Sequence, residues 1–269
     1  GRTTRVDVKF RSQALNEDRR LIIYLPVGYD AQYQRRYPVA YLLHGYGGGG
    51  QATTEWEGWQ LQGIAESLQQ KGEIQPMIIV QPDGFMDNGL PSYWFNHEPG
   101  TTDGKRWGDY VWQEVVNYID SKYRTLPNRA SRVIAGFSLG GQGALELGIL
   151  HPEIFSNVGA HSPSFRGADG SIDYFGGWNY FNQYDPIWLV ENHPEYAKRL
   201  NIWMDVGLDD DKVRKCGPGS DRCVEAFHAL LDAQNVPHVW HGDWPGKHEG
   251  VSYWAPHTAD YLRWYSSVL

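Results

Sequence analysis

The fold of this chain is decided by the stretch Arg132-Val133-Ile134-Ala135-Gly136-Phe137-Ser138-Leu139-Gly140-Gly141. Its first half is an apolar run typical of a buried strand, and its second half is typical of the start of a glycine-rich helix. Ser138 lies between them in a Gly-x-Ser-x-Gly pattern. A side chain on either neighbouring glycine would collide with the strand or helix packed beside such a sharp turn. The stretch therefore predicts a nucleophile elbow with an exposed Ser138 hydroxyl; the alternative is a serine in an ordinary glycine-rich turn.

Size and charge narrow the class of protein. The chain has 269 residues, of which 41% are hydrophobic, and this is enough to bury a full core. We expect one domain over residues 1–269, because no repeat or low-complexity linker marks a boundary. A formal net charge of −8 without a Lys or Arg cluster argues against nucleic acid and anionic membranes as partners. No apolar run approaches the length of a membrane span, and the first four residues do not look like a signal peptide.

The order of apolar patterns predicts an α/β fold with a mostly parallel sheet and helices on both faces. Strands are expected at 6–10, 20–26, 37–44, 77–81, 132–137, 158–162, 201–206 and 238–243. Helices are expected at 63–70, 107–123, 140–150, 224–234 and 252–269. Two long connections, 84–104 and 163–200, are rich in aromatic residues. Loops of this length in one domain are usually functional.

A serine nucleophile needs a general base and an acid that orients the base, which follow the serine in the order acid, then histidine. The acid should follow a late strand, and Asp209, Asp210 and Asp211 lie just past the strand at 201–206. The residues leave open which one is the acid; the others would be solvated or cap a helix, and a metal site lacks further ligands nearby. His248 is the expected base because it lies past the last strand, whereas two other nearby histidines fall within the strand pattern, where packing usually satisfies them.

A second glycine-rich stretch, His44-Gly45-Tyr46-Gly47-Gly48-Gly49-Gly50, follows a predicted strand. Such a loop can bring backbone N–H groups close to a substrate. The expected oxyanion-hole donors are the N–H of Tyr46 and the N–H of Leu139, directly after the nucleophile. The alternative is a flexible glycine turn.

The two cysteines, Cys216 and Cys223, bracket a turn-rich stretch that could bring them together. We expect a short-loop disulfide and therefore an oxidising compartment, such as that of a secreted protein. Two reduced thiols in a cytoplasmic protein are the alternative.

Four motifs, at 41–48, 77–84, 135–141 and 246–248, together resemble the putative-esterase family of α/β-hydrolases. That family joins feruloyl and acetylxylan esterases of carbohydrate esterase family one, S-formylglutathione hydrolases and mycolyltransferases. The resemblance implies a serine esterase that works through an acyl-enzyme with no cofactor and no metal. It also selects Asp210 as the acid, because Gly207-Leu208-Asp209-Asp210 matches the family's Gly-x-x-Asp pattern.

The cysteine pair and the aromatic segment 163–200 favour the secreted polysaccharide esterases within that family. The expected substrate is an acylated carbohydrate or a small ester, and Trp94 and Trp178 are the candidate residues for contacting it. An S-formylglutathione hydrolase, a general short-chain carboxylesterase and an acyltransferase stay open. So does a catalytically silent carbohydrate-binding protein on the same fold. The sequence does not indicate the acyl group or the oligomeric state.

Overall fold

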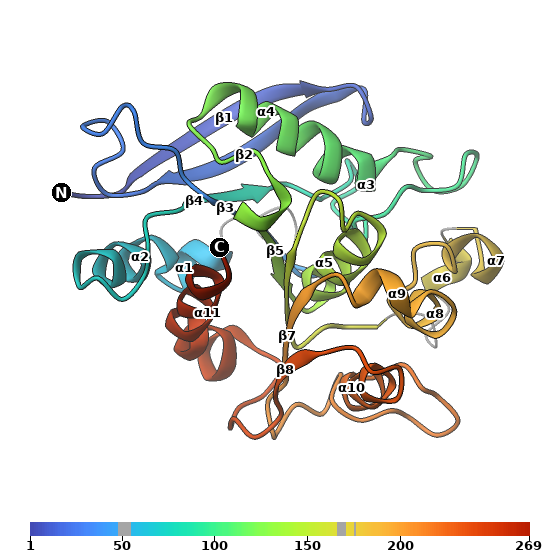
Figure 1. The fold of residues 1–269 in the computed structure, drawn as a ribbon. Coiled ribbons are helices and arrows are strands. Elements are labelled where there is room, and N and C mark those ends of the chain that lie inside the picture. The colour runs from blue at the N-terminus through green and yellow to red at the C-terminus, as the bar shows by residue number, and fades with distance from the viewer. Residues whose placement is uncertain (48–54, 166–170, 175) are drawn as a thin grey trace.

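The computed structural model describes residues 1–47, 55–165, 171–174 and 176–269, and its centre is an eight-stranded sheet (Figure 1). The strands lie in the order β1-β2-β4-β3-β5-β6-β7-β8. Their bounds are β1 Thr4–Ser12, β2 Glu17–Leu25, β3 Val39–Leu43, β4 Ile78–Pro82, β5 Arg132–Phe137, β6 Asn157–His161, β7 Asn201–Asp205 and β8 His238–His241. The pairs β1·β2 and β2·β4 are antiparallel and the others are parallel. The predicted mostly parallel sheet is confirmed.

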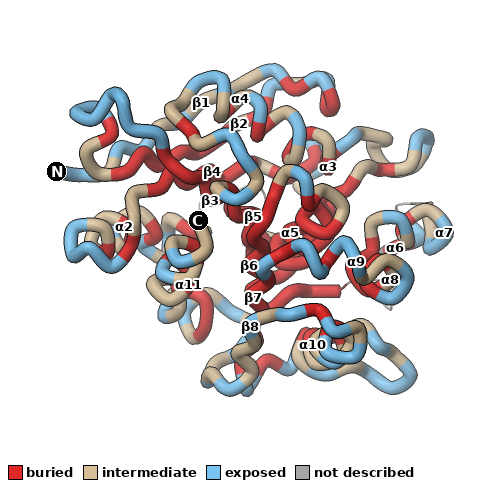
Figure 2. Tube along the Cα trace, viewed as in Figure 1, coloured by how far each residue is buried: buried red, intermediate tan, exposed pale blue. Residues whose placement is uncertain are grey.

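Helices cover both faces of the sheet, because consecutive strand residues alternate between two buried clusters. Ile23 of β2 packs on one face, and its neighbours Ile22 and Tyr24 pack on the other. The first face is covered by α4 (Val116–Lys122), α5 (Leu139–Leu150), α8 (Pro186–Asn192), α9 (Pro194–Ala197) and α10 (Val224–Ala233). The second face is covered by α1 (Glu55–Gly58), α2 (Leu61–Gln70) and α11 (Ala255–Val268). Figure 2 shows the resulting pattern: the inner strands and α5 are buried, whereas the edge strands β1 and β8 and the outer sides of α2 and α11 are more exposed.

The observed elements differ in detail from the expected ones, most clearly in two regions. The helix expected at 107–123 begins as α3 (Trp107–Asp109) and continues through a π-helical stretch, Tyr110–Val115, into α4. The segment 163–200 is not one long loop, since it contains α6 (Ser171–Tyr174), α7 (Trp178–Phe181), α8 and α9. These helices are too short to show a clear apolar period in the sequence. None of the helices in the described ranges combines the length and apolarity that crossing a membrane requires.

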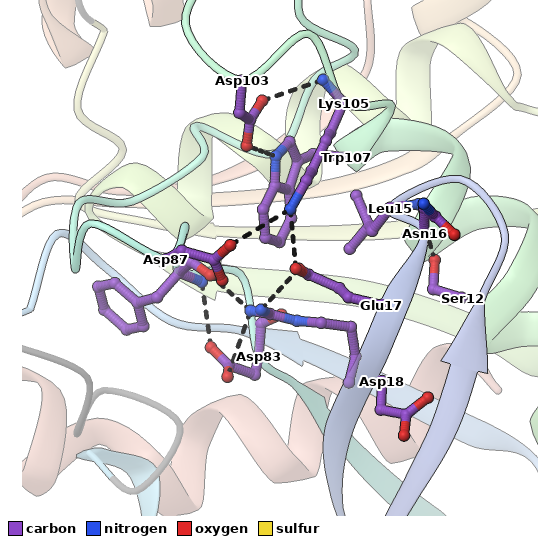
Figure 3. A network of polar contacts seen from close by, with 12 residues as sticks. Ser12, Leu15, Asn16, Glu17, Asp18, Asp83, Asp87, Asp103, Lys105 and Trp107 are labelled. Carbon is purple, nitrogen blue, oxygen red and sulfur yellow. Dashed lines mark hydrogen bonds and ion pairs between the residues drawn. The ribbon is translucent and has the colours of Figure 1, made fainter.

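Ion pairs connect the start of the aromatic segment 84–104 to the β1–β2 hairpin (Figure 3). The ammonium group of Lys105 lies 2.8 Å from Glu17 and 3.6 Å from Asp87. The guanidinium of Arg19 lies 2.9 Å from Glu17 and 3.3 Å from Asp83, with only 8% of the Arg19 side chain exposed. Because the Arg19 guanidinium is nearly buried, its charge is compensated by these carboxylates and only slightly by water. The hairpin therefore positions the segment that packs beside α5.

Candidate active site

Ser138 lies in a sharp turn between β5 and α5. Its backbone has φ 55° and ψ −120°, which is uncommon for a residue with a side chain. A Cβ added to Gly136 would lie 2.3 Å from the carbonyl oxygen of Gly140, and one added to Gly140 would lie 2.4 Å from that of Leu43. Neither contact is possible, so both positions require glycine. The turn has the geometry expected of a nucleophile elbow.

Ser138, His248 and Asp210 form a chain of hydrogen bonds. Ser138 Oγ lies 2.9 Å from Nε2 of His248, and Nδ1 of His248 lies 2.8 Å from Oδ2 of Asp210. Because a carboxylate only accepts, Nδ1 carries the proton and Nε2 presents its lone pair to the serine hydroxyl. In this tautomer His248 can remove the hydroxyl proton as Ser138 attacks a carbonyl carbon. The arrangement fits a nucleophile, a general base and an acid that orients the base.

Of the three consecutive aspartates, Asp210 is the one that faces His248. It is 3% exposed, whereas Asp209 and Asp211 are exposed to solvent. Its other carboxylate oxygen, Oδ1, accepts hydrogen bonds of 3.0 Å from the backbone N–H groups of Lys212 and Val213. These bonds fix the carboxylate in one orientation. The residue selected by the family pattern is thus the one that the fold brings to the histidine.

The two expected oxyanion donors lie on segments that meet beside Ser138. Leu139 is the first residue of α5, so its N–H has no partner one turn earlier in the helix. The loop that contains Tyr46 approaches from β3. A Cβ added to Gly45 would lie 2.6 Å from the Phe137 ring and 3.3 Å from Cβ of Ser138. This close approach places the backbone before Tyr46 against the elbow.

His44 holds the loop of Tyr46 in place through hydrogen bonds of its ring. Its Nε2 accepts the backbone N–H of Gly84 at 2.9 Å, so its Nδ1 carries the proton and donates to the carbonyl oxygen of Gly45 at 2.9 Å. The ring stacks on Phe85, with centroids 4.2 Å apart. Burial lowers the pKa of His44 to about 4, so the ring is neutral at pH 7. The glycines at 48–50, expected in the same loop, lie outside the described residues.

Trp94 does not occupy the substrate-facing position expected of it. Its side chain is 0% exposed. The indole fills the space that two glycines leave open, since a Cβ on Gly84 or Gly143 would lie 2.4 Å or 2.6 Å from the Trp94 ring. Its Nε1 donates to the carbonyl oxygen of His44 at 3.3 Å. The physical reason for the difference is packing: Trp94 joins α5 to the loop that carries Tyr46.

Trp178 lies at the surface, with 39% of the residue exposed. The guanidinium of Arg222 lies 4.9 Å from the Trp178 ring centroid and forms two hydrogen bonds, of 2.9 and 2.7 Å, with Asp185. Arg222 directly precedes Cys223, which the structure joins to Cys216 in a disulfide. Trp178 also lines a hollow of about 350 Å³ with Asn182, Trp188, Glu191 and Asp221. Neither Ser138 nor His248 lines that hollow, so the substrate role of Trp178 stays a prediction.

Sequence reasoning missed a buried polar cluster behind the triad, centred on Asp205 at the end of β7. Asp205 and His161 are both 0% exposed, and His161 Nδ1 lies 2.6 Å from Asp205 Oδ2. The same carboxylate accepts hydrogen bonds from Trp203 Nε1 and from the hydroxyl groups of Tyr253 and Tyr261. The one sequence signal was an acidic residue at the end of an otherwise apolar strand. Through Tyr253 the cluster supports the segment that follows His248.

Solved structures with the same fold include a ferulic acid esterase, with a TM-score of 0.82, 24% identity and 100% of both chains covered. An S-formylglutathione hydrolase from Agrobacterium tumefaciens has a TM-score of 0.79 and 18% identity over 99% of this chain and 96% of that one. At these identities the likeness shows the α/β-hydrolase fold.

Among curated proteins, an esterase of Mycobacterium tuberculosis is 29% identical over 154 residues, 57% of this chain and 31% of the relative. An endo-1,4-beta-xylanase/feruloyl esterase of Xylanibacter ruminicola is 29% identical over 159 residues, 56% of this chain and 20% of the relative. The matches thus span a third or less of each relative's length. Residues 12–264 match the family described as Putative esterase. Since that match spans most of the sequence, the chain belongs to this esterase family.

Proposed function

We propose that this protein hydrolyses acyl esters of plant polysaccharide, of the feruloyl or acetyl xylan type, with Ser138, His248 and Asp210 as its catalytic triad. The observation that carries the chemistry is the continuous hydrogen-bonded chain from Ser138 Oγ through His248 to Asp210. In such a chain the histidine removes the proton of the serine hydroxyl, which makes a weak nucleophile effective.

In the proposed reaction, Ser138 Oγ attacks the ester carbonyl carbon while His248 Nε2 takes the hydroxyl proton. The negative charge that develops on the carbonyl oxygen is held by the N–H groups of Leu139 and Tyr46. The C–O bond to the alcohol then breaks, and His248 gives its proton to the departing alcohol, which leaves an acyl group on Ser138. Water, deprotonated by His248, then attacks the acyl carbon. The bond to Ser138 Oγ breaks as His248 returns the proton to Oγ, and the acid is released. Asp210 keeps His248 in the required tautomer throughout.

The substrate class is supported by the names of similar proteins rather than by a residue in the site. One curated relative is an endo-1,4-beta-xylanase/feruloyl esterase, and a ferulic acid esterase has the same fold over the whole chain. The Cys216–Cys223 disulfide supports a protein that works in an oxidising compartment, and we propose that it is secreted. Mass analysis without reductant tests this part: two free thiols after expression under oxidising conditions would contradict it.

A second candidate is hydrolysis of a small thioester, because an S-formylglutathione hydrolase also has the same fold over 99% of this chain. The two candidates share the triad and differ in the acyl and leaving groups. A general short-chain carboxylesterase would use the same residues.

A substrate panel separates these candidates. We expect kcat/KM to be highest for methyl ferulate or acetylated xylo-oligosaccharides and lower for S-formylglutathione and p-nitrophenyl acetate. A preference for S-formylglutathione would replace the proposed substrate class, and activity on p-nitrophenyl acetate alone would reduce the proposal to a short-chain carboxylesterase. The Ser138→Ala variant is the control for all substrates. If the wild-type protein has no activity on any ester but binds xylo-oligosaccharides, the protein is a carbohydrate-binding relative.

A further inference from the structure

Three side chains with metal-binding atoms converge on α10 and β8, in a group that does not include the triad. Within the described ranges, His228, Asp232 and His238 each bring one such atom within 4.8 Å of the others. His228 and Asp232 lie four residues apart on α10 and so share one helix face. His238 is the first residue of β8, the strand at the edge of the sheet. The group joins two elements that also meet where the His228 ring stacks on Trp240.

The hydrogen positions in this group are constrained by its neighbours. His238 Nδ1 lies 2.8 Å from the backbone carbonyl oxygen of Val236, which can only accept, so a neutral His238 has its proton on Nδ1 and a lone pair on Nε2. That lone pair points at Nδ1 of His228, 2.7 Å away. On its other side, Nε2 of His228 lies 3.6 Å from a carboxylate oxygen of Asp232. A neutral His228 has one proton for two facing acceptors.

With Asp232 where it lies in this structure, either tautomer of neutral His228 leaves two lone-pair atoms facing each other, 2.7 Å apart at His238 or 3.6 Å apart at Asp232. A proton on Nδ1 satisfies His238 and leaves Nε2 against the Asp232 carboxylate; a proton on Nε2 does the reverse. A bound cation removes these facing lone pairs, as do a second proton or, when Nδ1 of His228 carries the proton, rotation of the exposed Asp232 side chain away from the ring. Two imidazoles and a carboxylate are the ligand types that zinc and similar divalent metals prefer.

We propose that His228, Asp232 and His238 bind a divalent transition-metal ion, for which Zn²⁺ is the best match. Both histidine rings are already held in place without a metal. Val236 fixes the tautomer of His238, whose side chain is 3% exposed, in the way that outer partners orient metal-bound histidines. The His228 ring stacks on Trp240 with centroids 4.2 Å apart and planes 8° apart.

Only a small adjustment is needed to admit the metal. Two nitrogens, each about 2.05 Å from a tetrahedral zinc, lie about 3.3 Å apart. His228 Nδ1 and His238 Nε2 are 2.7 Å apart and would move apart slightly. The Asp232 side chain, which is 65% exposed, is free to swing toward the metal, and water would complete the coordination. Bound metal would cross-link α10 to β8, the strand that leads into the segment carrying His248.

The test is a calorimetric titration of chelator-treated, tag-free protein with ZnCl₂, together with thermal unfolding at each metal concentration. We expect one equivalent of Zn²⁺ to bind and the midpoint of unfolding to rise by several degrees, because the ion binds the folded state. His238→Gln and Asp232→Asn should each weaken binding at least tenfold and remove the rise. Asp232→Asn tests the site even if His238→Gln does not fold, because Asp232 is exposed. Mg²⁺, which prefers oxygen ligands, should not replace Zn²⁺.

Two control variants make the result specific. His193 faces Glu195 at 3.4 Å on the surface and belongs to no group of three ligands among the described residues, so His193→Ala should bind Zn²⁺ as the wild type does. His248→Ala should also keep one equivalent, because the proposed site does not use the triad. Absence of Zn²⁺ binding, equal affinity in Asp232→Asn, or loss of the equivalent in His248→Ala would each overturn the proposal.

Discussion

The two groups of residues expected around Ser138, those for chemistry and those for substrate recognition, reach their positions in different ways. Asp210 and His248 follow β7 and β8, which are parallel neighbours, so their loops leave the sheet at the same edge. Trp94 and Trp178 come from two aromatic-rich segments with similar composition, yet one is 0% exposed and the other 39%. Strand order constrains the chemical residues strongly. Residue type alone does not tell a packed tryptophan from an accessible one.

Substitutions in the triad should lower activity most. Ser138→Ala and His248→Ala should each lower kcat for p-nitrophenyl acetate by roughly 10⁴- to 10⁶-fold, because triad members act as a unit. The double variant should lose little more than either single variant. Circular dichroism checks that each variant is folded. A folded Ser138→Ala protein that keeps most of its activity would remove Ser138 from the mechanism.

The acid should give the next largest effect. We expect Asp210→Asn to lower kcat by roughly 10⁴-fold, because an amide no longer holds His248 in the tautomer that accepts the serine proton. Asp209→Asn and Asp211→Asn are matched controls on adjacent exposed residues, and they should stay within about threefold of the wild type. If either control proves more sensitive than Asp210→Asn, the acid has been assigned to the wrong residue.

Some features of the fold and of the site could be predicted from the sequence, and others could not. The strand pattern was sufficient to predict the sheet, and the glycines around Ser138 were sufficient to predict the elbow. The position of His248 past the last strand indicated the base. The choice among three aspartates was not available from spacing, because it depends on which carboxylate turns inward to the N–H groups of Lys212 and Val213. Trp94 could not be placed either, since its pocket is created by Gly84 and Gly143, 59 residues apart in the sequence.

The two tryptophans should separate by stability and by substrate. Trp94→Ala should lower the free energy of unfolding by about 3–5 kcal/mol, because it leaves a cavity beneath α5. Trp178→Ala should cost about 1 kcal/mol or less, because Trp178 is partly exposed. Chemical denaturation measures both. A small loss for Trp94→Ala would contradict its packing role.

Kinetics adds a second criterion for the same pair. Trp178 packs on Phe181, which belongs to the buried cluster that contains Leu139. If it contacts substrate, Trp178→Ala should lower kcat/KM severalfold more for acylated xylo-oligosaccharides than for p-nitrophenyl acetate. Trp94→Ala should lower both alike. Equal losses in Trp178→Ala would remove Trp178 from substrate recognition.

The last expected effect needs no substitution: it is a pH dependence of stability from His44, which supports the loop of Tyr46. The pKa of His44 is lowered from 6.5 to about 4 by burial. Between these values the unfolded chain binds a proton that the folded chain does not, so this contribution is fully present above pH 6.5 and is lost as the pH falls toward 4. The loss amounts to roughly 3 kcal/mol at most.

His44→Gln provides the comparison, because its side-chain oxygen can accept the Gly84 N–H and does not titrate. Unfolding free energies measured from pH 7 to pH 4 should fall less steeply in this variant than in the wild type. Identical slopes would mean that His44 is not buried in its neutral form.

The central claim is that Ser138 is the activated nucleophile, and covalent labelling with an organophosphonate ester followed by peptide mass mapping tests it most directly. The account predicts one adduct per chain, on Ser138, with no labelling of Ser138→Ala and much slower labelling of His248→Ala because the hydroxyl has lost its base. An adduct on another residue, or labelling of Ser138→Ala at the wild-type rate, would contradict it.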